Sequence, residues 1–425
     1  MKFMEEHTKA LTGITLHTIP TKKYKTNTFV LRLKAPLQED TVSLRALLPY
    51  VLQSATKSLA STREVRQYLE EMYGASLSVD VGKKGDYHVM SFYMDIVNEK
   101  YLQDTTPLFE KALALLSEVL LQPLVEGDGF STSIVENEKR SLVQRIQSVF
   151  DDKLRYANER LMEEMCKNEV YQLNANGKVA DVQKIDNKML YTYYKQMLES
   201  DCKDIYIIGD VEESDCIEMV NKYFTLPSCA TVTNEKKTES IKVEEKEIIE
   251  KQDIHQGKLH IGYRTHTSYC DQDYYALQVF NGIFGGFSHS KLFINVREKN
   301  SLAYYAASRY ESHKGLLMVM AGIEAENYEK AVTIIKEQMQ AMKDGDFTDQ
   351  EITQTKAVIR NQLLESIDTS RGTIEMMYHN VVAGCERPMS EWVANVEKVT
   401  KDEIVAVANK VELDTIYFLK GTEGK

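Results

Sequence analysis

The sequence predicts an α+β fold of two similar domains, each a mostly antiparallel sheet packed with helices. The chain has 425 residues, well beyond the roughly 250–300 residues at which a single hydrophobic core stops growing. Both halves mix segments of strand composition around turn residues with segments of helical periodicity. Several landmarks of the first half recur in the same order in the second half, which indicates an internal duplication.

The recurring landmarks are a strand and a turn. The apolar strand-like run at 203–213 resembles the run at 414–423. The dipeptide Lys84-Gly85 lies between two strand-like runs, and Lys314-Gly315 has the same setting. A helix-period segment follows each turn, at 106–121 and 327–342.

A polar segment separates the two halves. After Pro227 the chain is rich in Glu and Lys, a composition that buries little and is typical of a linker. We therefore expect a first domain at 1–225, a linker at 226–252 with an edge strand near Ile248, and a second domain at 253–425.

The elements follow from periodicity and turn residues. In the first domain we expect strands at 27–37 and on both sides of a turn within 74–94, and helices at 43–57, 63–72, 106–121, 133–150 and 154–167. In the second we expect strands at 258–264, 303–310 and 315–323, and helices at 272–283, 325–343, 349–366 and 374–383. Pro49 should bend the helix at 43–57, unless that helix begins near it.

Composition narrows the classes of function. Hydrophobic residues make up 43% and charged residues 27%, which excludes a wholly disordered chain. The net charge of −12 argues against nucleic acid as a partner and permits a basic peptide. No apolar run approaches the roughly 18 residues of a membrane span. Glu5, Glu6 and Lys9 stand where a signal peptide would be apolar, so we expect a cytoplasmic protein.

The cysteines support the same compartment. No two form a C-x-x-C pair, so we expect reduced thiols, with neither a disulfide framework nor a thiolate metal site. The six are Cys166, Cys202, Cys216, Cys229, Cys270 and Cys385.

One long motif carries a family resemblance. It reads Gly285-Gly-Phe-Ser-His-Ser-Lys-Leu-Phe-Ile-Asn-Val-Arg-Glu-Lys-Asn-Ser-Leu-Ala-Tyr304. Together with weaker agreement at 177–193, it resembles the insulinase-like M16 metallopeptidases, which include the mitochondrial processing peptidase subunits. The resemblance covers nearly the whole chain and implies the fold of that family, which LuxS and the processing peptidase share.

The resemblance also implies a zinc site that this sequence has lost. Active members carry H-x-x-E-H on the first long helix, with a glutamate ligand from a later helix. At the matching positions stand Pro49, Leu52, Gln53 and, for the later glutamate, Arg145. Proline has no ligand atom, leucine takes no proton, an amide is a poor ligand, and a guanidinium repels a dication. None of the nine histidines forms another H-x-x-E or i, i+4 pattern. We expect no metal and no cofactor in this chain.

A second pair of residues is retained. In the family, an arginine and a tyrosine of the last domain face the zinc across a clamshell of four domains, built from one chain or from two. The matching residues are Arg297 and Tyr304. A phenol can stabilise an oxyanion, and a guanidinium can bind a substrate carbonyl or orient the phenol.

The resemblance therefore implies a non-catalytic subunit, inactive alone. It would complete the cavity of a zinc-bearing M16 paralogue, or of a second copy of itself, and bind an extended peptide by strand addition. Zinc is expected only in the partner, and neither nucleic acid nor membrane is expected to bind.

Other interpretations stay open at this point. Arg297 could merely pair with Glu298, and Tyr304 could be a half-buried strand residue next to Tyr305. The chain could be a peptide-binding or scaffold protein with no peptidase role, or an enzyme that uses unrecognised residues. Neither a Gly-x-Ser-x-Gly elbow nor a phosphate-binding P-loop occurs in the sequence.

Overall fold

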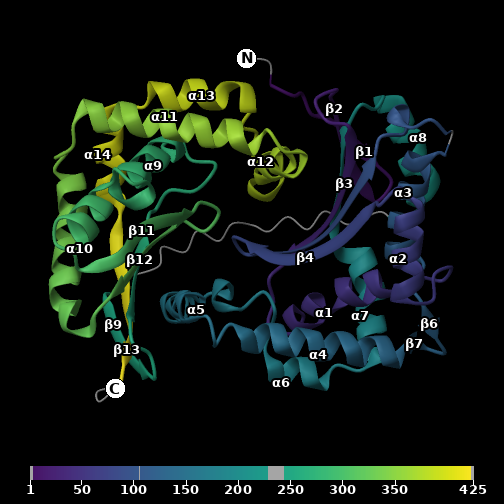
Figure 1. Cartoon of the computed structure of the whole chain (residues 1–425), viewed down its shortest axis with the longest axis horizontal. Coiled ribbons are helices and arrows are strands. Elements are labelled where there is room, and N and C mark those ends of the chain that lie inside the picture. The colour runs from purple at the N-terminus through teal and green to yellow at the C-terminus, as the bar shows by residue number, and fades with distance from the viewer. Residues whose placement is uncertain (1–2, 105, 228–243, 423–425) are drawn as a thin grey trace. The chain divides into compact units, whose positions relative to one another are not determined.

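The computed structural model describes residues 3–104, 106–227 and 244–422 (Figure 1). These residues form two compact units. Unit 1 takes the described residues within Met1–Ser148, Leu173–Lys236 and Ser370–Ile374. Unit 2 takes those within Val149–Gln172, Lys237–Thr369 and Glu375–Lys425. The division crosses the predicted domain ranges at two places. Val149–Gln172 groups with unit 2, and Ser370–Ile374 groups with unit 1.

Unit 1 is built on a six-stranded sheet of order β1-β2-β8-β3-β5-β4. Strand β2 pairs with β8 in parallel, and the other neighbours are antiparallel. The strands are β1 (His7–Leu11), β2 (Ile14–Pro20), β3 (Thr26–Pro36), β4 (Ser76–Lys84), β5 (Tyr87–Val97) and β8 (Cys202–Gly209).

The helices of unit 1 bury apolar side chains against this sheet. Helix α1 is buried around nearly all its circumference, which is typical of a helix enclosed in a core. The helices are α1 (Val42–Ser54), α2 (Thr62–Glu71), α3 (Leu108–Leu121), α4 (Thr132–Ser148), α6 (Val179–Lys184), α7 (Asn187–Ser200) and α8 (Glu213–Tyr223), with a small hairpin of β6 (Val125–Glu126) and β7 (Gly129–Phe130).

Unit 2 is built on a five-stranded sheet of order β11-β12-β10-β13-β9. The strands are β9 (Lys246–Gln252), β10 (Gly257–Arg264), β11 (Ala303–Glu311), β12 (Leu316–Ile323) and β13 (Glu412–Gly421). Strand β9 lies at an edge and provides the strand expected near Ile248.

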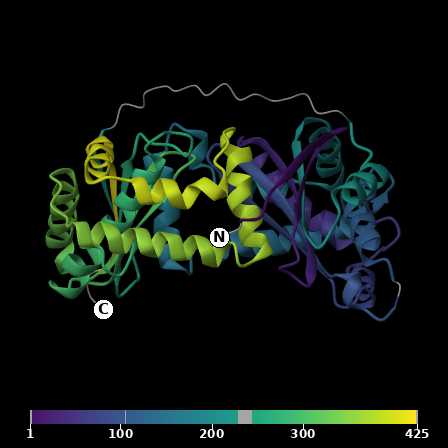
Figure 2. The same ribbon diagram turned by 90° about the horizontal axis from the view of Figure 1, so that it is seen from above.

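Helices cover both faces of this sheet. Helix α5 (Lys153–Met165) packs on β10 and β13, and α9 (Tyr274–Asn281), α10 (Tyr328–Lys343) and α14 (Lys401–Lys410) lie on the other side (Figure 1). Gly262 makes room for α5, because a Cβ there would lie 2.5 Å from Met165 Sδ. Figure 2 shows, in green to yellow, three further helices of the second half of the chain, α11 (Asp349–Ser366), α12 (Ser370–Ala383) and α13 (Met389–Lys398). The first residues of α12, Ser370–Ile374, group with unit 1.

The two sheets share one topology. The order β2-β8-β3-β5-β4 corresponds to β9-β13-β10-β12-β11, and in both the first pair is parallel while the rest are antiparallel. The hairpins β4–β5 and β11–β12 turn at Gly85 (φ 53°) and Gly315 (φ 72°), in the left-handed region that favours glycine. These are the two repeated Lys-Gly landmarks. The predicted α+β fold of two similar domains is confirmed.

The cysteine prediction is wrong at one pair. Cys270 and Cys385 form a disulfide, with their Cα atoms 6.0 Å apart and a separation of 115 positions in sequence. Local spacing could not reveal a pair that only the tertiary structure brings together. The sequence also predicts that the free thiols are buried. Cys166 and Cys216 are buried, Cys202 is only partly buried, and Cys229 lies outside the described residues. Within the described part of the chain, no helix combines the length and the apolar character that crossing a membrane requires.

Candidate functional site

Arg297 lies in a π-helical segment, Phe293–Glu298. The wide turn shows in its hydrogen bonds, since the Lys299 amide donates to the Ile294 carbonyl at 2.8 Å. Ser301 then takes φ 50°, an unusual conformation for a residue with a side chain, and leads the chain into β11. Such π-turns are frequent at functional sites.

Tyr304 lies on a β-bulge at the start of β11. Ala303 pairs with Ile323, but Ala306 pairs with Ala321. Two residues of β11, Tyr304 and Tyr305, therefore lie opposite the single residue Gly322 of β12. Bulges redirect side chains and are common next to active sites. The Tyr304 side chain is 79% exposed, whereas Tyr305 is half-buried.

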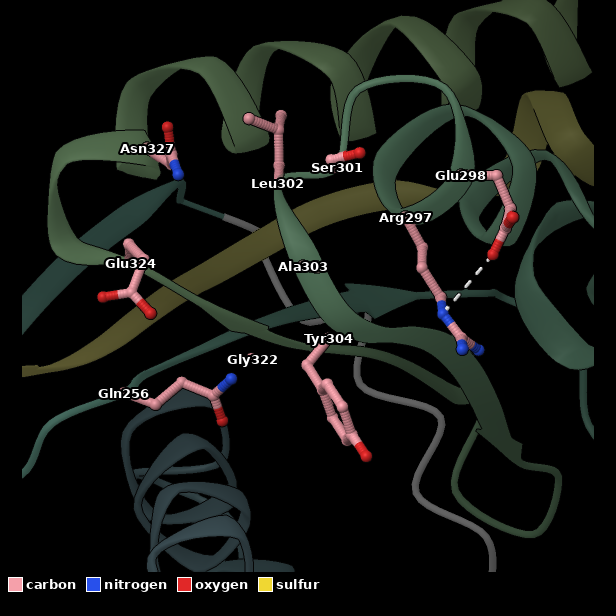
Figure 3. A pocket seen from close by; sticks show the side chains of 10 residues that line it. All are labelled: Gln256, Arg297, Glu298, Ser301, Leu302, Ala303, Tyr304, Gly322, Glu324 and Asn327. Carbon is pink, nitrogen blue, oxygen red and sulfur yellow. Dashed lines mark ion pairs between the residues drawn. The ribbon is translucent and has the colours of Figure 1, made fainter.

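Arg297 and Tyr304 line the same open hollow, of about 520 Å³ (Figure 3). In the figure Tyr304 projects from β11, and Arg297 projects from the helical turn before it, with its ion pair to Glu298 dashed. We call this space the Arg297–Tyr304 hollow. It is lined by Gln256, Arg297, Glu298, Ser301, Leu302, Ala303, Tyr304, Gly322, Glu324 and Asn327, all within unit 2.

The contacts of Arg297 are weak ones. Its Nε lies 3.5 Å from a Glu298 carboxylate oxygen, and its guanidinium lies 4.6 Å from the centre of the Phe293 ring. Exposed ion pairs of this kind contribute about 0–1 kcal/mol. The pair between Arg297 and Glu298 therefore exists, but breaking it would cost little free energy.

The positions that match the family's zinc ligands and catalytic glutamate lie in unit 1, where their side chains make other contacts. Leu52 is fully buried, and the Gln53 side-chain amide donates to the Leu77 carbonyl at 2.9 Å. The Arg145 guanidinium stacks 4.0 Å from the centre of the Tyr50 ring. Burial raises the pKa of Tyr50, although the nearby guanidinium opposes that rise.

Zinc does not fit this set of residues. Pro49 is buried inside α1, where it offers no ligand atom. Glu138, a carboxylate nearby on α4, accepts a hydrogen bond from Ser54 Oγ at 2.9 Å. Among the residues described, no three His, Cys, Asp or Glu side chains gather closely enough to hold a metal ion.

Two of the histidines are buried within the sheets and are not part of the hollow. His88 and His260 are fully buried, one in each sheet, and burial lowers the pKa of each to about 3. Both are therefore neutral packing residues at physiological pH.

Comparison with known proteins places the chain in a family. Residues 184–359 match the model described as the peptidase M16 inactive domain. The chain is 53% identical to "Probable inactive metalloprotease YmfF" of Bacillus subtilis over 424 residues, 100% of both chains. The chain belongs to the M16 peptidase family. It is a homologue of an inactive M16 metalloprotease, as the resemblance implied.

Another relative and two solved structures are also similar to this chain. The chain is 23% identical to the subtilosin biosynthesis protein AlbE of Bacillus subtilis, over 80% of this chain and 87% of AlbE. A conserved protein of Enterococcus faecalis has a structure with TM-score 0.90 at 33% identity, covering 99% of both chains. An M16 inactive-domain structure from Pseudomonas fluorescens gives 0.77 at 17% identity, again over 99% of both chains, and so supports the fold.

Sequence reasoning gave a role in the site to Arg297 and Tyr304, named Glu298 only as a partner of Arg297, and gave no role to the other lining residues. Gln256 and Glu324 come from the ends of β-strands far from the motif, with no local signal to connect them to it. Gly322 and the bulge opposite it carry no clear signal in the sequence, because residues 303–311 show no regular alternation that the extra residue would interrupt.

Proposed function

We propose that this M16 homologue is the non-catalytic subunit of a heterodimeric zinc peptidase. In this role it completes the peptide-binding cavity and supplies Arg297 and Tyr304 to the active site of a zinc-bearing M16 partner. The observation that carries the proposal is the 79% exposure of Tyr304 on an open hollow that Arg297 also lines. A phenol so exposed, in a chain whose zinc positions hold other side chains, is suited to a site completed by another molecule.

The chemistry follows from the two side chains. Attack on a peptide carbonyl creates an oxyanion, and the Tyr304 hydroxyl can donate a hydrogen bond to it. The guanidinium of Arg297 can donate to a neighbouring carbonyl of the substrate through its planar set of N–H groups. The partner would provide the metal and its activated water.

An extended peptide suits the sheets of the fold. Strand β11 is an edge strand of its sheet and begins at the hollow, so a peptide could add to it through main-chain hydrogen bonds. The net charge of −12 favours a basic peptide. A relative at 22% identity over 73% of this chain is itself named a subunit, the beta subunit of the yeast mitochondrial processing peptidase.

Reconstitution tests the proposal. We expect the chain mixed with a co-encoded H-x-x-E-H protein to cleave peptides that neither cleaves alone. Tyr304→Phe should lower kcat by about 10²–10³-fold, the usual cost of losing one oxyanion donor. Tyr101→Phe is the matched control, because Tyr101 is also exposed, at 51%, but lies in unit 1.

Two results would contradict it. An active complex in which Tyr304→Phe changes nothing would remove the shared-site mechanism. Peptide binding without joint cleavage would favour the alternative of a peptide-binding or scaffold protein. Location in the cytoplasm stays a prediction, which fractionation of cells producing the chain would check.

A further inference from the structure

We propose that Gly322 and Tyr305 are positioning residues that turn Tyr304 out into the Arg297–Tyr304 hollow. They do so by maintaining the β-bulge at the start of β11. The positioning of Tyr304 does not depend on the proposed function, whereas its importance for peptide cleavage rests on that function. Neither residue would contact substrate in this role.

The burial pattern of β11 shows why the bulge matters. Side chains of a regular strand alternate between its two faces. Ala306 and Ser308 are buried, so Tyr304, two positions before Ala306, would share their face in an unbroken strand. Instead Tyr304 is exposed and Ala303 is buried. The extra residue at 304–305 reverses the alternation, and without it Tyr304 would face inward.

Gly322 gives the bulge its space. It stands on β12 between Ala321 and Ile323, the two residues that pair with the ends of the bulge. A Cβ built on Gly322 would lie 2.5 Å from the Tyr305 ring atom Cε1 and 3.0 Å from Gln256 Oε1. Any side chain at position 322 therefore overlaps the Tyr305 ring. Because the ring is rigid, the overlap can be relieved only by moving the whole ring.

The ring of Tyr305, and not its hydroxyl, makes the contact. The Lys258 ammonium lies 5.8 Å from the ring centre and also donates to Gln256 Oε1 at 2.7 Å. The Tyr305 Oη is buried and has no hydrogen-bond partner among the described residues. Burial also raises the pKa of Tyr305 to about 12. Removing the Tyr305 hydroxyl should leave the bulge intact, whereas displacing the Tyr305 ring should disrupt it.

Nitration with tetranitromethane tests the geometry without any partner protein. The reagent modifies accessible tyrosines, and fragment-ion mass spectrometry separates residue 304 from residue 305. In the parent chain we expect Tyr304 to react and Tyr305 to be spared. In Gly322→Ala we expect Tyr305 to react and the yield at Tyr304 to fall. Tyr305→Phe should keep the parent yield at Tyr304.

Gly82→Ala is the matched control. Gly82 also lies in a strand, β4, but nothing stands within 4 Å of a Cβ added there. The Gly82→Ala variant should keep the parent pattern of nitration at Tyr304 and Tyr305. If Gly322→Ala fails to fold, Tyr305→Ala removes the ring instead and should likewise lower the yield at Tyr304. A folded variant of either kind with the parent nitration pattern would overturn the proposal.

Activity of the reconstituted complex separates this inference from the proposed function. We expect Gly322→Ala to lower kcat about as much as Tyr304→Phe does, with a smaller change in KM, and Tyr305→Phe to keep parental activity. An altered nitration pattern with unchanged cleavage would leave the positioning role standing and would count against the shared site.

Discussion

At the scale of single residues, His17 is a buried titratable group that lies between two carboxylates. This buried histidine on β2 has Nδ1 2.7 Å from Glu6 Oε1 and Nε2 3.1 Å from Asp204 Oδ1, and its ring stacks on Tyr206. Burial lowers the pKa of His17, but the hydrogen bonds to Asp204 and Glu6 outweigh it, and the pKa is raised above 6.5. When the ring is protonated, it connects Glu6, before β1, to Asp204 on β8.

The sign of the pH dependence follows from that raised pKa. The stabilisation is fully present below the unfolded pKa of His17 and is lost as the pH rises through the higher folded pKa. We expect the urea midpoint to fall over this interval, and His17→Gln to flatten the fall as well as lower the midpoint. His7→Gln is the control, because His7 pairs with Glu213 at an exposed site. Equal pH profiles for the parent and His17→Gln would contradict the assignment.

At the scale of elements, the disulfide joins the loop before α9 to the chain just after α12. The Tyr269 hydroxyl donates to Asn380 Oδ1 at 3.0 Å, and Arg387 Nε donates to the Tyr269 carbonyl at 2.6 Å, so hydrogen bonds flank the bond between Cys270 and Cys385. The two segments are held together by covalent and polar contacts at once.

Loss of this bond should destabilise unit 2. Chain entropy predicts up to about 4–5 kcal/mol for a loop of this length, less where the unfolded chain retains structure. We expect the pair Cys270→Ser and Cys385→Ser to lower the unfolding midpoint, and a reductant to lower it in the parent chain but not in the variant. Two free thiols at these positions in the non-reduced protein, counted by mass spectrometry, would show that the bond does not form.

At the scale of the whole molecule, one fold occurs twice and neither copy holds a metal-ligand set among the described residues. We therefore expect the purified chain to bind no stoichiometric zinc, and a chelator to leave its thermal unfolding unchanged, because a ligand stabilises only a state that binds it. Elemental analysis and a thermal scan check this, with an H-x-x-E-H homologue as the positive control. One tightly bound zinc per chain would contradict it.

Elements with strong local signals were predictable. Helix α11 occupies the predicted range 349–366, and it begins with a capping box between Thr348 and Glu351. Helix α1 runs through Pro49 although proline costs a hydrogen bond, since its burial in the core outweighs that cost. Strands β1 and β2 were not predicted, because their stability comes from pairing with each other and with the distant β8.

The amino-acid sequence alone determined the α+β class and the repeated architecture, because composition and periodicity are local properties. The replaced zinc ligands and the matching Arg297 and Tyr304 are what the family resemblance implies, and their roles stay predictions. The tertiary structure alone decided that Tyr304 points outward, that Cys270 meets Cys385, and that α5 packs in unit 2. Those outcomes depend on strand register and on contacts between residues far apart in the chain, which no local pattern records.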